Sequence, residues 1–294
     1  MIPIVKDNYI RPSGAGSTWA CEFDLFPKQF GNLFEESCLA AEEIYSLKQG
    51  RVHIMYGGGI DGEYTLSVFR HLGMKVTPVI VQLSKYNTHD TDYAFKFCQT
   101  HNIDPIIIDI DFDKFVKSGM LLNYAKQYRS EMYHRSAIMY AISKLNGTII
   151  MGDNEPYICK NELGSWNYQI NEHDYAIVNY FKENSIVGTP HFGCWTSGIN
   201  AAFLTDPVMV ELANNLHPGK LGSFSSKHKI YNNCSNFNLE VRPKYTGYEL
   251  IEQSEIFKHE SFKELAEFGK TCNGCYEEDY FKFIDRLSNG TNTQ

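Results

Sequence analysis

The residues with the clearest chemical potential are a run of glycines followed by an acid, Gly57-Gly58-Gly59-Ile60-Asp61-Gly62. So many glycines destabilise helix and strand alike, so the run must be a turn that needs positive φ or the close approach of a ligand. Such a turn exposes backbone N–H groups beside a helix N-terminus, where an anion such as a phosphate binds. A tight turn without a ligand is the alternative, but it requires fewer glycines. We therefore favour a ligand at residues 57–62.

The elements that must position this turn follow from the hydrophobic spacing on either side of it. A short apolar run at residues 52–56 predicts a buried strand, and apolar residues at helical spacing predict a helix from about residue 63 to 72. The same alternation continues along the chain. It predicts strands at 75–83, 105–110 and 148–151, with helices at 90–101 and 120–145. Strands that alternate with helices imply right-handed crossovers, so we expect an α/β fold with a parallel sheet and flanking helices.

Four regions are expected along the 294 residues. Residues 1–34 lack a sustained period and predict an irregular N-terminal arm, and residues 35–160 are expected to form the α/β core that holds the ligand of the glycine turn. Residues 161–287 show helical pieces without clear strand alternation, which predicts a helical, loop-rich C-terminal part that completes the site. Residues 288–294 form a polar tail.

Composition narrows the class of partner and the compartment. The net charge is −8 and no Lys/Arg block stands out, which argues against a nucleic-acid backbone as the main partner while leaving a local basic groove open. The chain shows neither a long apolar run nor a basic, apolar leader, so we expect no membrane span. The eight cysteines are scattered, which favours reduced thiols. These features predict a soluble cytoplasmic protein with a small-molecule substrate.

The glycine turn resembles the PP-loop of the ATP pyrophosphatase superfamily, whose usual form is S-G-G-x-D-[ST]. Gly58, Gly59 and Asp61 match that form, whereas Gly57 and Gly62 stand where the family has hydroxyl residues. Neither the P-loop nor the dinucleotide-binding glycine pattern is present. The synthetase domain of asparagine synthetase-like enzymes is the most similar branch. We expect no counterpart of the glutaminase half of those enzymes, because only about 50 residues precede the first strand and residue 2 is Ile.

Other segments support the same resemblance over roughly residues 35–250. Asp90-Thr-Asp92-Tyr93-Ala94 is similar to the opening of the helix after strand two, and Gly152-Asp153-Asn154-Glu155-Pro156 to the acidic motif after strand four. Residues 227–231 and 242–249 are similar to the C-terminal region in which lysines meet the adenylate.

The resemblance implies an adenine nucleotide alpha hydrolase-like fold and a set of site residues. The nucleotide contacts would be Gly57, Gly58, Gly59, Asp61, Gly62, Gln82, Leu83 and Gly152. The catalytic lysines would be Lys227 and Lys244, and the Mg²⁺ ligands would be Asp61, Asp153 and Glu155. Two alternatives stay open at this stage. Asp61 is also a favoured helix N-cap, and Arg135, on a mostly apolar helix, would make either a buried ion pair or a phosphate contact.

The activity that the resemblance implies is that of an ATP-dependent ligase or amidotransferase-like enzyme. Such an enzyme adenylates a carboxylate or base carbonyl and transfers a nitrogen nucleophile, releasing AMP and pyrophosphate. A separate amidotransferase, free ammonia or a free amine would supply the nitrogen. The alternatives are a base-modifying enzyme that forms a sulfur or nitrile product, and a protein that binds ATP without cleaving it because the two hydroxyls are lost.

Cys272 and Cys275 have the C-x₂-C spacing that allows two thiolates to bind one Zn²⁺. A tetrahedral site needs two more ligands, for which the candidates are Cys194, Cys234, His228 and His259. Some PP-loop enzymes that make deazapurine nitriles carry a C-terminal zinc cluster. Two unliganded thiols in a turn are the alternative interpretation.

Overall fold

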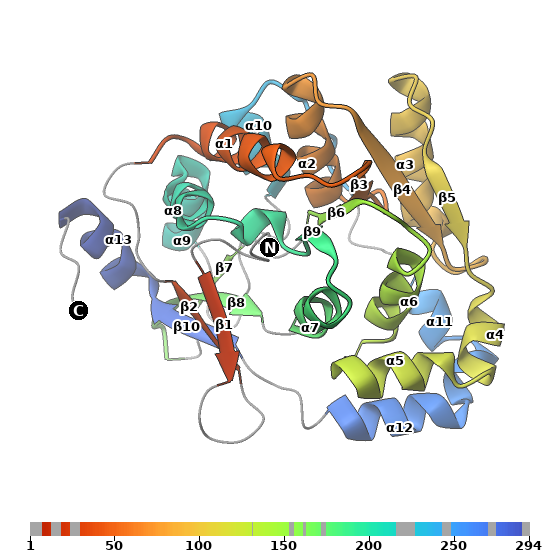
Figure 1. Ribbon diagram of the computed structural model, residues 1–294. Helices are drawn as coiled ribbons and strands as arrows, with labels where there is room; N and C mark the ends of the chain where they lie inside the picture. The colour runs from red at the N-terminus through yellow and green to blue at the C-terminus, as the bar shows by residue number, and fades with distance from the viewer. Residues whose placement is uncertain are drawn as a thin grey trace.

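The structure is a computed structural model of the chain (Figure 1). It describes residues 8–12, 19–23, 30–130, 132–152, 156–160, 163–171, 175–215, 227–242, 248–269 and 275–289. No helix within these ranges is long and apolar enough to cross a membrane.

A five-stranded parallel sheet forms the centre of the fold, in the order β5-β4-β3-β6-β9. Its strands are β3 (Val52–Met55), β4 (Val76–Gln82), β5 (Ile106–Asp109), β6 (Thr148–Met151) and β9 (Val187–Thr189). The first four coincide with the strands predicted from apolar runs. The α/β class and the parallel sheet with flanking helices are therefore confirmed.

Helices cover both faces of this sheet (Figure 1). One apolar cluster joins α1 (Leu33–Ser46), α2 (Ile60–His71) and α3 (Thr88–Thr100) to β3 and β4. Another cluster packs the opposite face, where the helices are α5 (Met120–Tyr128), α6 (Tyr133–Ile142) and α7 (Tyr175–Glu183). Two faces covered by helices are what a parallel sheet requires, because its strands are apolar on both sides.

Pro78 lies within β4, which is an interior strand. Pro78 pairs with Ile54 of β3, whereas the pairing of β4 with β5 begins only at Val79. The backbone of Val79 faces β3, since its carbonyl accepts from the Tyr56 N–H at 2.8 Å. The neighbouring Pro78 nitrogen therefore faces the β5 side before β5 begins, so its missing N–H leaves no gap in the ladder.

The N-terminal arm is not irregular throughout, contrary to the sequence-based expectation. β1 (Asn8–Pro12) and β2 (Trp19–Phe23) form an antiparallel hairpin, with Asn8 opposite Phe23. The connection between the strands is long, so the short-turn signal that reveals a hairpin in a sequence is missing.

The prediction of a helical C-terminal half is incomplete. A second, antiparallel sheet has the order β10-β8-β7, built from β7 (Tyr157–Lys160), β8 (Trp166–Asn171) and β10 (Cys275–Asp279). β9 also adds a fifth strand to the central sheet from this half of the chain. These strands are short and mostly polar, and β10 pairs with a strand far away in the sequence, so local periodicity could not reveal them.

The remaining helices pack around these sheets. α13 is anchored in the main core, since the Tyr280 hydroxyl donates to the Leu204 carbonyl at 2.8 Å. The remaining elements are α4 (Phe112–Lys117), η2 (Phe192–Cys194), α8 (Ser197–Thr205), α9 (Pro207–Asn215), α10 (Lys227–Cys234), α11 (Glu249–Glu252), η3 (Glu255–Lys258), α12 (Glu260–Gly269) and α13 (Tyr280–Asn289).

Candidate functional site

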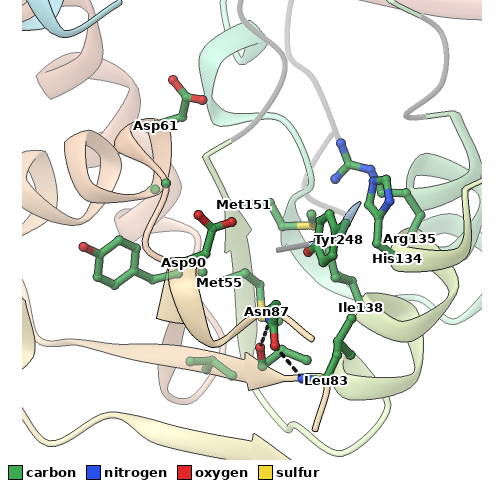
Figure 2. Close-up of a pocket in the computed structure, with 16 residues that line it drawn as sticks. Met55, Asp61, Leu83, Asn87, Asp90, His134, Arg135, Ile138, Met151 and Tyr248 are labelled. Atoms are coloured by element: carbon green, nitrogen blue, oxygen red, sulfur yellow. Dashed lines mark hydrogen bonds between the residues drawn. The ribbon is translucent and has the colours of Figure 1, made fainter. Parts of the chain in front are cut away.

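A cavity of about 250 Å³, called the cleft from here on, lies at the carboxyl ends of β3 and β4 (Figure 2). In the sheet, β3 lies between β4 and β6. The connections that follow neighbouring strands therefore run to opposite sides of the sheet, which leaves a crevice at the carboxyl ends of these strands. The cleft is lined by Met55, Tyr56, Gly57, Gly59, Asp61, Gly62, Val79, Val81, Leu83, Asn87, Asp90, His134, Arg135, Ile138, Met151 and Tyr248. Its volume is slightly below the roughly 300–1,000 Å³ of small-molecule sites.

The glycine turn forms one edge of this cleft. Gly59 is the N-cap of α2, with φ −68° and ψ 154°, and its carbonyl accepts a hydrogen bond from the Glu63 N–H. The N–H groups of the first turn therefore have no partner within the helix. A Cβ atom placed on Gly57 or Gly59 would meet nothing within 4 Å. The backbone here is open to an approaching anion.

Gly58 has a different role from its neighbours. Its φ is +97°, and a Cβ atom here would collide with the backbone carbonyl of Asp90 in α3. Gly152 is likewise a packing glycine, because a Cβ atom would lie 2.8 Å from both the Asp61 carbonyl and the Thr65 Oγ1. The structure thus explains these two glycines by contact with α3 and α2, and their predicted nucleotide contacts stay predictions.

The end of β4 separates two residues that the sequence analysis grouped together. Backbone groups alternate in direction along a strand. The Val79 carbonyl bonds toward β3, and the Gln82 carbonyl accepts from the Ile110 N–H on the β5 side at 2.8 Å. The backbone of Leu83 therefore faces β3 and the cleft, whereas that of Gln82 faces away. Leu83 lines the cleft, and Gln82 is not among its lining residues.

Asp61 and Lys227 meet at the rim of the cleft. The Lys227 ammonium lies 2.9 Å from Asp61 Oδ2, and the Tyr231 hydroxyl donates to Asp61 Oδ1 at 2.7 Å. Lys227 and Asp61 side chains are 10% and 22% exposed. Burial, together with the Asp61 charge, holds the pKa of Tyr231 well above its usual value, so this hydroxyl keeps its proton. The N-cap alternative for Asp61 is wrong, because Gly59 occupies that position without a side-chain cap bond.

Sequence reasoning missed a second charged pair behind the turn. Arg242 forms an ion pair with Glu63, and the Tyr56 hydroxyl donates to the same carboxylate at 2.6 Å. The Arg242 Nε also donates to the Gly58 carbonyl at 3.3 Å, and its guanidinium lies 4.3 Å from the centre of the Tyr93 ring. Arg242 therefore fastens the glycine turn to α2 and α3. Asp61, Glu63, Lys227 and Arg242 are called the charged wall below.

Asp90, which also lines the cleft, has a carboxyl group with a strongly raised pKa. Burial raises its pKa to about 7, the negative charge of Glu249 adds to the rise, and Arg242 partly offsets it. From the sequence, Asp90 was expected only as the opening of a helix that is similar to the one after strand two of the family. Nothing in its local sequence announces the shift, because Glu249 and Arg242 come from distant segments.

The other side of the cleft is mainly apolar. Met55, Val79, Val81, Leu83 and Ile138, called the apolar floor below, come from β3, the end of β4 and α6. His134 and Arg135 of α6 lie above the floor beside Tyr248, whose ring stacks on the His134 ring at 5.0 Å and 10° (Figure 2). Arg135 lines the cleft, and its two interpretations, a buried ion pair and a phosphate contact, both stay predictions.

Several predicted site residues fall outside the described part of the chain. Lys244, Asp153, Glu155 and Cys272 lie there, and of Cys275 only the backbone, at the start of β10, is described. Among the described residues, no group of three or more His, Cys, Asp or Glu side chains could hold a metal ion. Both the Zn²⁺ and the Mg²⁺ sites therefore stay predictions.

No known family model matches this sequence, and no curated protein matches it. The cleft combines open backbone N–H groups, an apolar floor of the kind that accepts a flat ring, and a lysine held at the rim. These three features together suit a nucleotide.

Proposed function

We propose that this protein is an ATP pyrophosphatase-type enzyme that adenylates a small acceptor and transfers a nitrogen nucleophile to it. One observation carries the proposal: Asp61 and Lys227, selected separately from distant parts of the sequence, form an ion pair at the rim of the cleft. The glycine turn that precedes Asp61 borders the same cleft. We assign the parallel sheet to the adenine nucleotide alpha hydrolase-like fold on the same grounds.

The described residues fit a nucleotide. Gly57 and Gly59 leave open space where side chains would otherwise stand, so phosphate oxygens can reach the N–H groups of the first turn of α2. The apolar floor offers a base a surface of aliphatic side chains. Burial of the base against Val79 and Leu83 would remove apolar surface from water, which favours binding.

The proposed reaction has two steps. An oxygen of the acceptor attacks the α-phosphorus of ATP, and the bond to the bridging oxygen breaks, so pyrophosphate leaves with the electron pair. The nitrogen nucleophile then attacks the adenylated carbon, AMP leaves, and the nitrogen loses a proton. Lys227 provides positive charge near the phosphates, where charge develops. Asp90, with a pKa of about 7, is suited to accept that proton near neutral pH.

The described residues show no cluster that would hold Mg²⁺ at Asp61, so a Mg²⁺ site at this residue stays a prediction. Both oxygens of this carboxylate already accept hydrogen bonds, one from the Lys227 ammonium and one from the Tyr231 hydroxyl. A divalent cation next to the ammonium would be repelled by it. Asp61 keeps Lys227 in place, and the proposed reaction does not depend on a metal at this residue.

Pyrophosphate release tests the proposal. The purified protein is incubated with ATP, ammonia or simple amines, and a panel of carboxylates, while pyrophosphate and AMP are measured. We expect acceptor-dependent formation of both products in equal amounts. Asp61→Asn should reduce turnover strongly, because the variant loses the charge that holds Lys227. ATP binding without any pyrophosphate would instead establish the non-catalytic alternative.

One observation favours that non-catalytic alternative as the second candidate. A Cβ atom on Gly62 would lie 3.1 Å from the Tyr56 ring, so the hydroxyl side chain of the usual PP-loop does not fit at this position without a shift of the ring. A turn without this hydroxyl holds the leaving pyrophosphate with backbone groups alone. The base-modifying alternative depends on Cys272 and Cys275, whose side chains lie outside the described part.

A further inference from the structure

Asn87 occupies an unusual place at the end of β4. Its side chain is buried, with 5% of the residue exposed, and it lines the cleft. The carboxamide Nδ2 donates to the Val81 carbonyl at 2.8 Å, and Oδ1 accepts from the Leu83 N–H at 2.7 Å (Figure 2). One planar amide group therefore satisfies a backbone donor and a backbone acceptor two residues apart.

The direction of these backbone groups explains why they need a partner. Val81 and Leu83 face the β3 side, like Val79, whose carbonyl bonds to Tyr56 N–H. β3 ends at Met55 and the chain then turns away through the glycines, so no strand continues beside the last residues of β4. The exposed donor and acceptor would otherwise face the open cleft, and Asn87 folds back from the start of α3 to meet them.

The same donor and acceptor match the edge of an adenine ring. Adenine presents an N6 amino donor beside the N1 acceptor, and both nitrogens are bonded to the same carbon atom. The nitrogen and oxygen of a carboxamide are likewise bonded to one carbon, so the two groups present a donor and an acceptor at similar spacing. A base lying on the apolar floor would therefore compete with Asn87 for the Val81 carbonyl and the Leu83 N–H. Hypoxanthine presents the opposite pattern, an N1–H donor beside an O6 acceptor, and would not match these groups.

We propose that Asn87 determines base selectivity in this cleft by occupying the backbone pair that would otherwise select adenine. The parent protein then holds the base through the apolar floor and discriminates weakly between ATP and ITP, two nucleotides that differ at this edge. Removal of the carboxamide exposes the pair and creates a preference for adenine. This inference rests on the proposed nucleotide site but not on the adenylation step.

The test compares ATP and ITP affinities in the parent, in Asn87→Ala and in a matched control, by calorimetry. Asn87→Ala should raise the ATP-to-ITP affinity ratio by roughly tenfold, the effect of two hydrogen bonds made to one base and not to the other. The control is Ser84→Ala. Ser84 holds the same loop in place on the β5 side. Its hydroxyl donates to the Ile110 carbonyl and accepts from the Phe112 N–H, each at 3.1 Å. This variant should leave the ratio unchanged.

Using a ratio keeps the test valid if either variant loses some stability, since both affinities are measured on the same protein. An unchanged ratio in Asn87→Ala, with ATP still bound, would show that Asn87 only closes the loop. A ratio that falls would show that Asn87 itself reads adenine, which also overturns the inference. Failure of the parent to bind either nucleotide would remove the proposed function along with it.

Discussion

The charged wall, of which Asp61 lines the cleft, and the apolar floor of the cleft are assembled from different parts of the chain. The floor comes from β3, β4 and α6, elements of the first half whose apolar runs are visible in the sequence. The wall brings Lys227 and Arg242 onto Asp61 and Glu63 at the start of α2. The apolar floor thus forms as soon as the parallel sheet and α6 are packed. The ion pairs form only when the second half of the chain packs against α2. Within the charged wall, we expect Lys227 to serve the chemistry and the Arg242–Glu63 pair to serve stability.

The largest effect within the charged wall is expected at Lys227. Lys227→Met removes the positive charge at the rim, so we expect pyrophosphate release to fall by about 10²–10³-fold, as when a donor at a site of developing charge is lost. Lys229→Met is the matched control, because Lys229 lies on the same helix but is exposed. Equal turnover in the two variants would assign Lys227 a structural role only.

The Arg242–Glu63 pair should matter for stability. Its side chains are 14% and 7% exposed, so Arg242→Leu leaves a buried carboxylate without its cation and should lower the free energy of unfolding by about 3 kcal/mol. The comparison pair is Lys126–Glu264, whose side chains are 56% and 50% exposed. Lys126→Ala should cost less than about 1 kcal/mol. Chemical denaturation measures both, and similar losses would contradict the distinction.

Substitutions at two neighbouring glycines should distinguish an effect on stability from an effect on ATP binding. Gly58→Ala places a Cβ atom against the Asp90 carbonyl at positive φ, and should destabilise the protein by about 2 kcal/mol. Gly59 has ordinary φ and open space, so Gly59→Val should fold but obstruct the approach to the first turn of α2 and abolish measurable ATP binding. Unchanged ATP affinity in folded Gly59→Val would refute the phosphate-binding role of the turn.

The smallest effect is a pH dependence at Asp90. Because its pKa is raised to about 7, the folded protein holds a proton there that the unfolded chain releases at lower pH. The contribution of Asp90 to the free energy of unfolding therefore falls as the pH rises from about 4 to 7. Asp90→Asn should be more stable than the parent by about 1 kcal/mol at pH 8, after allowance for solvent screening, and equally stable at pH 4. A constant difference across this range would contradict the raised pKa.

The apolar spacing of the first half determined much of the fold in advance. The runs that became β3, β4, β5 and β6 are long and apolar enough to be buried on both faces, and the glycines between β3 and α2 mark the turn unambiguously. The residues at the edge of the cleft, Gly57, Gly59 and Asp61, were therefore predictable. β7, β8 and β10 were not, because their short polar sequences gain strand structure only by pairing with one another.

Other features of the site depend on tertiary structure alone. Arg242 carries no local signal for its contact with Glu63, and Asn87 was not singled out at all, because its role depends on where β3 ends beside β4. The raised pKa of Asp90 comes first from its burial, and Glu249 from a remote helix adds to the rise. A sequence records the periodicity that buries a strand, since that information is local. The pairing of charges, and the backbone groups left exposed where one strand outlasts its neighbour, exist only after distant segments have packed together.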